Sequence, residues 1–231
     1  MSYLAKKIHC TNCKNRSSCF NVLSNLDHKF VEANRVELKF RAGEVICKQG
    51  AFASSIMYVY QGLVKTYLET PEGSHVVLNV LPEGSFIGLC SLFTDYIYHQ
   101  SAAAIIDSTV CSVDIKVFEE FSKSNGEFAS EVIKMLNHYI MSNNQRFLSL
   151  THKQTNGRFA DAMIFLSEKV YKSTKFTLTM MRKDLAELTG MSPESISRVI
   201  TQFKKDGIID VKGKEYEILK MDRLKTISIV G

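Results

Sequence analysis

The stretch TMMRKDLAELTGMSPESISRVITQFKKDGIIDVKGKEYEIL, residues 179–219, decides the fold of the C-terminal part of the chain. It predicts a helix over Met180–Leu188, with Thr179 as its N-cap and with acidic and basic residues on its outer face. Gly190 breaks this helix. Ser192 then caps a second helix, which has Pro193 at its first position. Helix, tight turn and helix together predict a helix-turn-helix.

The residues after this second helix predict a small β-wing. Gly207 ends the helix, and two short apolar runs, Ile208–Val211 and Tyr216–Leu219, flank the basic turn Lys212–Gly213–Lys214. A further short run, Phe176–Leu178, precedes the first helix. The segment as a whole therefore predicts a winged helix-turn-helix, which places its second helix in the major groove of DNA.

The second helix carries polar residues near its N-terminus, at the positions that would contact base edges in the major groove. Glu194, Ser197 and Arg198 share one face near its N-terminus, where Arg can grip guanine and Glu can accept from the cytosine amino group. Nearby lysines are placed to contact phosphates. The alternative is that Glu194 and Arg198 form an ordinary exposed ion pair. The predicted DNA-binding residues are Glu194, Ser195, Ser197, Arg198, Thr201, Lys204, Lys205, Lys212 and Lys214.

The N-terminal part of the chain has a different sequence pattern. Residues 36–114 alternate short β-type runs with glycines every 7–12 residues, which predicts an antiparallel barrel or roll. From about Val117 to Leu150 the apolar residues fall at helical spacing. A helix this long has more apolar face than the roll would cover, so we expect it to pair with a second copy, the alternative being a helix that lies wholly on its own roll. The predicted dimer contacts are Ile133, Leu136, Ile140 and Phe147.

Composition and charge fit a two-part regulator. The 231 residues are 45% hydrophobic and 23% charged, no apolar run is long enough for a membrane helix, and MSYLAKKIHC lacks a signal-peptide core, so we expect a cytoplasmic protein without a membrane partner. Residues 1–151 hold 14 Lys+Arg and 14 Asp+Glu, whereas residues 152–231 hold 15 and 10. A neutral N-terminal part followed by a basic C-terminal part indicates a sensory domain joined to a nucleic-acid-binding domain.

Two segments of the sequence resemble a known family of proteins. MSPESISRVITQFKKDGII is similar to the recognition segment of the CRP/FNR family of bacterial regulators, and FRAGEVICKQG…SSIMYVYQGLVKTY…LPEGSFIGLCSLF resembles the sensory β-roll of that family. The resemblance implies an α+β protein with a cyclic-nucleotide-binding-like β-roll, a long dimerisation helix and a C-terminal winged helix-turn-helix. The expected divisions are 1–30 for a cysteine-containing segment, 31–116 for the roll, 117–151 for the dimerisation helix and 152–231 for the DNA-binding domain.

The resemblance also bears on the operator and on the effector. The pattern E-x-x-S-R, met by Glu194, Ser197 and Arg198, resembles the FNR branch, whose half-site is TTGAT-like, while Pro193 stands where cyclic-AMP receptors carry an arginine. Those receptors hold the nucleotide with a Glu after F-x-G and with an Arg-Ser pair. Here Leu89 follows Phe86–Ile87–Gly88, and Gln100 precedes Ser101. Without the carboxylate and the cation, cyclic-nucleotide binding is disfavoured.

Six cysteines suggest what the protein senses. Three of them, Cys10, Cys13 and Cys19, form C-x2-C-x5-C, and clustered thiols outside an oxidising compartment indicate metal or redox chemistry more often than disulfides. Three thiolates need a fourth ligand. The FNR branch resembles this chain in the same run and in a fourth ligand just before the long helix, which implies a [4Fe–4S] cluster on Cys10, Cys13, Cys19 and Cys111. Zinc, a thiol switch and no metal stay open, and Cys47 and Cys90 are expected to be buried small hydrophobes.

The sequence therefore predicts a dimeric DNA-binding transcription regulator that responds to oxygen or redox state through an iron–sulfur cluster. Its expected partners are double-stranded DNA, a second copy of itself and RNA polymerase. The alternatives are a regulator of the same type with another effector or none, and a thiol- or metal-dependent enzyme. Against an enzyme, the sequence has no Ser/His/Asp set, no P-loop and no βαβ pattern around Cys10–Cys13.

Overall fold

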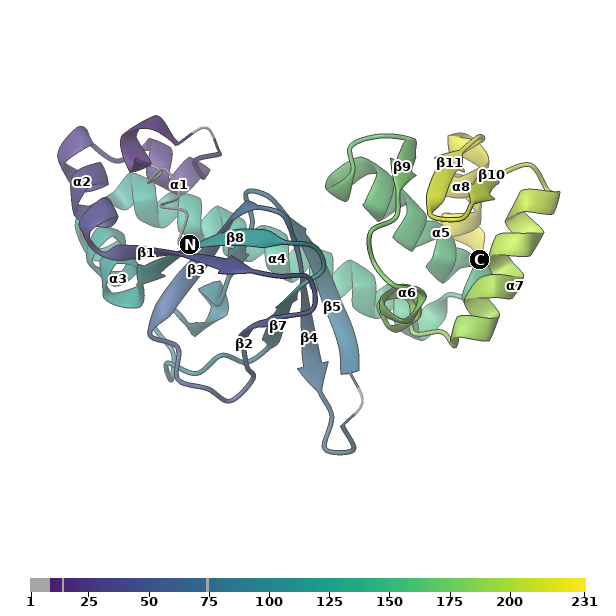
Figure 1. Cartoon of the computed structure of the whole chain (residues 1–231), viewed down its shortest axis with the longest axis horizontal. Helices are drawn as coiled ribbons and strands as arrows, with labels where there is room; N and C mark the ends of the chain where they lie inside the picture. The colour runs from purple at the N-terminus through teal and green to yellow at the C-terminus, as the bar shows by residue number, and fades with distance from the viewer. Residues whose placement is uncertain (1–8, 14, 74) are drawn as a thin grey trace, which may run out of the picture. The chain divides into compact units, whose positions relative to one another are not determined.

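The computed structural model describes residues 9–13, 15–73 and 75–231 (Figure 1). The chain divides into two compact units, an N-terminal unit within residues 1–64 and 83–139 and a C-terminal unit of residues 65–82 and 140–231. The elements up to the start of the long helix are η1 Cys10–Asn12, α1 Ser18–Asn21, α2 Asn25–Ala33, β1 Arg35–Phe40, β2 Val45–Cys47, β3 Ser55–Gln61, β4 Leu63–Glu69, β5 His75–Pro82, β6 Phe86–Ile87, η2 Leu89–Ser91, β7 Ser101–Ala104, β8 Ser108–Asp114 and α3 Ile115–Ser124.

The predicted antiparallel roll is confirmed and consists of two four-stranded sheets. One has the order β1-β8-β3-β6 and the other the order β2-β7-β4-β5. In the first sheet β8 is central, and the register sets Cys111 of β8 opposite Glu37 of β1 on one side and opposite Tyr58 of β3 on the other. The backbone turns that the glycines were expected to make are present, since Gly43, Gly50, Gly62, Gly73 and Gly84 all have positive φ.

Aromatic rings fill the core of the N-terminal unit. Phe20 of α1 packs edge-on against Phe118 of α3 with ring centroids 5.5 Å apart, and Phe118 lies 5.7 Å from Phe128. Phe118 and Phe128 are fully buried. These contacts fix α1, and with it the segment that carries the cysteine run, against α3 and the first turns of the long helix.

The helical stretch expected as one dimerisation helix from residue 117 to residue 151 consists of two helices. α3 ends at Ser124, and α4 runs over Gly126–His152. Asn125 causes the break, because its side-chain oxygen accepts from the backbone N–H groups of Glu127 and Phe128, both at 3.1 Å, and so caps a new helix. The apolar spacing continues through the break, which is why periodicity alone did not reveal it. Among the described helices, none is both long and apolar enough to cross a membrane.

The C-terminal unit contains the predicted helix-turn-helix and wing. After α4 come α5 Thr155–Phe165, η3 Leu166–Val170, β9 Lys175–Thr177, α6 Arg182–Thr189, α7 Pro193–Lys205, β10 Ile209–Lys212, β11 Glu215–Ile218 and α8 Met221–Val230. The three strands pair in the order β10-β11-β9. Phe159 of α5 packs edge-on against Phe203 of α7 at 5.4 Å, so the predicted apolar face of α7 is in the core. The terminal helix α8 was not predicted.

Two expectations for the first helix of the motif are wrong. Thr179 does not cap it, because the helix begins at Arg182 and the Thr179 N–H and hydroxyl contact the hydroxyl oxygen of Tyr171 at 3.1 and 3.0 Å. Asp184 does not lie on an outer polar face. It is 4% exposed, accepts from the N–H of Met181 at 3.2 Å and forms an ion pair with Lys65 of β4. Asp184 therefore caps α6 and ties it to a distant strand.

Candidate nucleic-acid interface and cysteine site

Local sequence fixes the start of α7 and the turn before it. Gly190 ends α6 in the left-handed conformation, with φ +60°, which favours glycine. The Ser192 hydroxyl accepts from the Ser195 N–H at 3.2 Å, and Pro193 takes the first helical position. The last turn carries Lys204 and Lys205. Both ends of α7 thus follow the capping pattern expected from the sequence.

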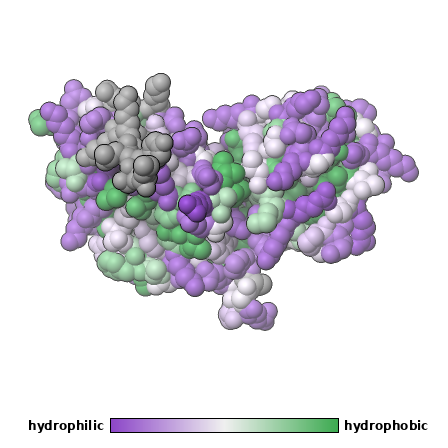
Figure 2. Space-filling model, viewed as in Figure 1, coloured by the Kyte–Doolittle hydropathy of each residue, from purple (hydrophilic) through white to green (hydrophobic). Residues whose placement is uncertain are grey.

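The polar face of α7 is open to solvent, opposite the buried stripe formed by Ile196, Val199, Ile200 and Phe203. On the face of the C-terminal unit visible in Figure 2, hydrophilic residues alternate with smaller apolar areas. Of the predicted DNA-binding residues, Ser195 and Ser197 are half-buried, and the exposed ones are Glu194, Arg198, Thr201, Lys204, Lys205, Lys212 and Lys214.

The contacts near the N-terminus of α7 leave its charged groups available. Among the described residues, Glu194 and Arg198 form no ion pair, so the alternative of a simple surface pair finds no contact here. The hydrogen bond from Ser192 lowers the pKa of Glu194, which keeps it an ionised acceptor. The Ser197 hydroxyl donates to the Pro193 carbonyl and accepts from Arg182 Nη1, both at 3.0 Å. The sequence analysis did not single out Arg182, because its contact with Ser197 joins two different helices.

The predicted phosphate-contacting lysines differ in their partners. Lys204 Nζ donates to the Val211 carbonyl at 2.6 Å and lies 3.9 Å from Asp210, so it links α7 to the wing. Lys212 lies 3.2 Å from the other oxygen of Asp210. Lys205 and Lys214 have no carboxylate partner among the residues that the structure describes. The wing turn between Lys212 and Lys214 contains Gly213 at φ +63°.

Three of the four predicted metal-binding cysteines lie together. Cys10, Cys13 and Cys111 line a cavity of about 40 Å³, shared with Arg35 and Tyr58. The Arg35 guanidinium donates to Cys10 Sγ from Nε at 3.1 Å and to Cys111 Sγ from Nη1 at 3.4 Å. The long-range register of β1 and β8 sets this contact, since Arg35 begins β1 and Cys111 lies on β8. Burial raises the pKa of Cys10 and of Cys111 by more than the guanidinium of Arg35 lowers it, so both thiols titrate above their ordinary pKa.

The fourth predicted ligand, Cys19, is fully buried on α1 and does not line this cavity. Its nearest polar contact is the Ser17 hydroxyl at 3.5 Å, and burial raises its pKa to about 12. Burial also raises the pKa of Cys111 to about 11, with Arg35 opposing the rise. Within residues 9–13, 15–73 and 75–231, no three potential ligands lie close enough to hold one metal ion. The thiols fit an iron–sulfur site in chemistry, but their arrangement would have to change to ligate one group.

The two remaining cysteines, Cys47 and Cys90, differ in their exposure to solvent. Cys47 is 8% exposed, as expected for a small buried hydrophobe. Cys90 is exposed, so the expectation that it is buried is wrong. Cys90 lies in the short turn η2, which follows Gly88 at φ +81°. The neighbours Leu89 and Ser91 take the inward positions of that turn, and Cys90 faces out.

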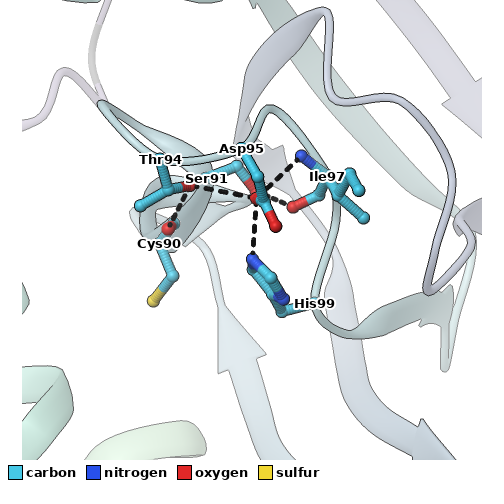
Figure 3. A network of polar contacts seen from close by, with 6 residues as sticks. All are labelled: Cys90, Ser91, Thr94, Asp95, Ile97 and His99. Atoms are coloured by element: carbon cyan, nitrogen blue, oxygen red, sulfur yellow. Dashed lines mark hydrogen bonds and ion pairs between the residues drawn. The ribbon is translucent and has the colours of Figure 1, made fainter.

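The turn that precedes Gln100 and Ser101 is held by hydrogen bonds among its own residues (Figure 3). Asp95 Oδ1 accepts from the Ile97 N–H at 3.3 Å and lies 3.0 Å from His99 Nε2. Phe93 and Tyr96 have left-handed φ values of 59° and 57°, a conformation that costs energy in residues with a side chain. Leu89 is buried, and the Gln100 amide donates to the Tyr139 hydroxyl.

Two family models match the chain. The model for the cyclic nucleotide-binding domain matches residues 37–125, and the model for the Crp-like helix-turn-helix domain matches residues 157–227. The first match covers strands β2 to β8 of the roll, and the second covers the winged helix-turn-helix.

Curated relatives and solved structures are similar along most of their length. Electron transport regulator A of Shewanella oneidensis is 27% identical over 96% of this chain and 90% of its own. Transcriptional activator protein anr of Pseudomonas aeruginosa is 25% identical over 96% and 93%. The fumarate nitrate reduction regulatory protein of Klebsiella oxytoca is 26% identical over 96% and 90%. The structure of FixK2 from Bradyrhizobium japonicum has a TM-score of 0.79 at 21% identity, covering 85% of this chain and 98% of that one.

Proposed function

Because the chain belongs to the CRP/FNR family of DNA-binding transcription regulators, whose members are regulators and not enzymes, we propose that it binds a two-fold related, TTGAT-like operator as a homodimer. The observation that carries the proposal is the polar face of α7. Glu194 and Arg198 are exposed near the helix N-terminus, and Ser197 lies between them in the sequence. The opposite face of α7 is buried in the core.

The chemistry of this face supports base recognition. Arg198 can donate two hydrogen bonds to a guanine, and Glu194 can accept from a cytosine amino group. The contact from Arg182 orients the Ser197 hydroxyl beside them. Within the part of the chain that the structure describes, Lys205 and Lys214 have no carboxylate to compete with a phosphate, so they suit sequence-independent contacts. Five exposed apolar side chains of α4, among them Ile133, Ile140 and Phe147, support pairing with a second copy.

Replacing Arg198 with Ala tests the DNA-reading role. We expect binding to weaken by about 1–3 kcal/mol and to lose preference at one base pair of each half-site, because one bidentate contact is removed. Binding to a set of single-base operator variants, measured by fluorescence anisotropy, gives both numbers. Arg223→Ala is the matched control, since Arg223 is an exposed arginine on α8. Unchanged affinity and base preference in Arg198→Ala would remove α7 from base reading.

We further propose that Cys10, Cys13, Cys19 and Cys111 hold a [4Fe–4S] cluster, as an oxygen-responsive element. The support is the contact of Arg35 with Cys10 and Cys111, the presence of Cys13 in the same cavity wall, and the similarity to regulators of FNR type. When bound, such a cluster supplies a centre that oxygen can oxidise. The guanidinium of Arg35 would offset the negative charge of ligating thiolates. Cys19 would have to leave its buried position on α1 to join the others.

Iron and sulfide analysis after anaerobic purification tests the cluster. We expect iron and sulfide in equal amounts with a visible absorption band, and loss of both in Cys111→Ser. Cys47→Ser and Cys90→Ser are matched controls that should keep the iron, because neither cysteine lines the cavity shared by Cys10, Cys13 and Cys111. Protein that contains no iron when prepared without oxygen would contradict the cluster, and zinc in its place would identify the other metal that this thiol set suits.

A further inference from the structure

The C-terminal unit contains a cavity of about 490 Å³ that the DNA-binding role does not use. Its wall is formed by β5, the last turns of α4, α5, η3, the end of α6 and one residue of α8. The volume falls in the range of sites for small organic ligands. The cavity lies within one compact unit and is separate from the polar face of α7.

The two acidic residues of the wall are already neutralised. Asp161 forms an ion pair with Lys153 at 2.9 Å and also accepts from the hydroxyls of Ser149 and Ser228. Glu168 forms an ion pair with Lys225 at 3.0 Å. Neither carboxylate is therefore available to the other cations of the wall.

Two arginines of the wall have no such partner. Among the described residues, neither Arg146 nor Arg158 forms an ion pair. Arg146 donates to the Val77 carbonyl, and Arg158 Nη1 donates to the Gly190 carbonyl at 3.0 Å. The Nε atom of each guanidinium is buried and has no hydrogen-bond acceptor. Burial also lowers the pKa of Arg146 to about 10, which still leaves it charged at neutral pH.

Arg146 and Arg158 are both partly buried, and each keeps one buried N–H donor, at Nε, without an acceptor. A buried donor without an acceptor costs free energy, which an anion in the cavity would relieve. The planar guanidinium matches the oxygens of a phosphate group, which can accept from several N–H donors at once. Lys169 adds a third cation to the same wall.

The rest of the wall suits an organic body attached to that anion. Leu148, Leu150, Ile164 and Phe165 provide an apolar side. Ser149, which lines the cavity, lies nine residues after Ile140, or about two and a half helical turns, so the exposed apolar stripe of α4 is on the opposite side.

We propose that this cavity binds a small organic phosphate, of about the size of a nucleoside monophosphate, with Arg146 and Arg158 holding the phosphate. Of the β-roll, only Leu78 and Asn79 of β5 line the cavity, and the positions compared above with the nucleotide contacts of cyclic-AMP receptors, Leu89, Gln100 and Ser101, do not. The proposal does not depend on the iron–sulfur cluster or on the operator sequence.

Calorimetric titration of the full chain in phosphate-free buffer tests the site. The probes are adenosine 5′-monophosphate, guanosine 5′-monophosphate and glucose 6-phosphate, with adenosine and glucose as partners that lack the phosphate. We expect at least one phosphate to bind with a Kd below about 1 mM and to raise the midpoint of thermal unfolding, and its uncharged partner to do neither. If none of the three phosphates binds, the proposal is overturned.

Charge variants locate the binding. We expect Arg146→Gln and Arg158→Gln each to weaken the bound phosphate at least tenfold, and Arg146→Lys to lose less. Lys175→Gln is the matched control, because it removes one positive charge from the same unit at a residue outside the cavity wall. Equal binding by all four variants would overturn the proposal. Should Arg146→Gln fail to fold, as judged by circular dichroism, Arg158→Gln and Lys169→Gln decide the question.

Discussion

The buried carboxylate of Asp184 both caps a helix and forms an ion pair with a lysine. Its side chain is 6% exposed, caps the N-terminus of α6 and faces Lys65, whose side chain is 17% exposed. Removing one partner of a buried ion pair leaves the other charge without compensation. We therefore expect Asp184→Ala to lower the free energy of unfolding of the C-terminal unit by about 3–5 kcal/mol, as measured by urea denaturation followed by circular dichroism.

The neighbouring residue supplies the control for this prediction. Lys183 forms a pair with Glu187 at 3.8 Å, but its side chain is 75% exposed. Solvent screens such a pair, so Lys183→Ala should change the free energy of unfolding by no more than about 1 kcal/mol. A loss in Asp184→Ala no larger than that in Lys183→Ala would show that the buried pair is not what holds α6.

Sequence patterns could not predict either member of this pair. Lys65 and Asp184 are 119 residues apart, and nothing in a local pattern says that two such residues meet. The same limit applies to Arg35, which no local pattern singles out. The β1–β8 register brings it to Cys111, and it also contacts Cys10. Arg146 and Arg158 are similar cases, since a helix pattern does not show that their Nε atoms are buried without acceptors.

Among the elements, those with a strong local signal were predicted and those without one were not. α7 was predicted because Ser192, Pro193 and a clean apolar stripe mark it together. α8 was missed because Lys220 makes no side-chain cap and only Leu224 of the helix is buried. The break at Asn125 was missed because apolar spacing runs through it, and the cap that makes it depends on one side-chain oxygen.

Lys204 and Lys205 are adjacent on α7 yet should act differently in DNA binding. Lys205 has no carboxylate partner among the described residues, whereas Lys204 donates to the wing at Val211 and lies near Asp210. We expect Lys205→Gln to lower the slope of log K against log salt by about 0.9, because one phosphate contact is lost, and Lys204→Gln to lower it by less. Affinities measured at several salt concentrations give the slopes. Equal slopes for the two variants would contradict the tethering role of Lys204.

At the scale of the whole molecule, we expect a second copy of the chain to cover the apolar stripe of α4. Ile133, Ile140 and Phe147 are 57%, 52% and 69% exposed, while Leu136 is partly buried. Large apolar side chains gathered on one helix face gain free energy when a second copy covers them. An operator with two related half-sites needs two copies of α7. Dimerisation and operator binding should therefore fail together when this face is changed.

Ile140→Glu tests that link, since it places a charge in the middle of the stripe, where burial would desolvate it. We expect monomers in sedimentation equilibrium at micromolar concentration and the loss of high-affinity binding to a two-half-site operator, while the far-ultraviolet circular dichroism stays that of the folded chain. His138→Glu is the matched control, because two residues rotate an α-helix by about 200° and His138 thus faces away from the stripe. A dimer that persists in Ile140→Glu would place the contact elsewhere, and operator binding by a proven monomer would separate DNA recognition from dimerisation.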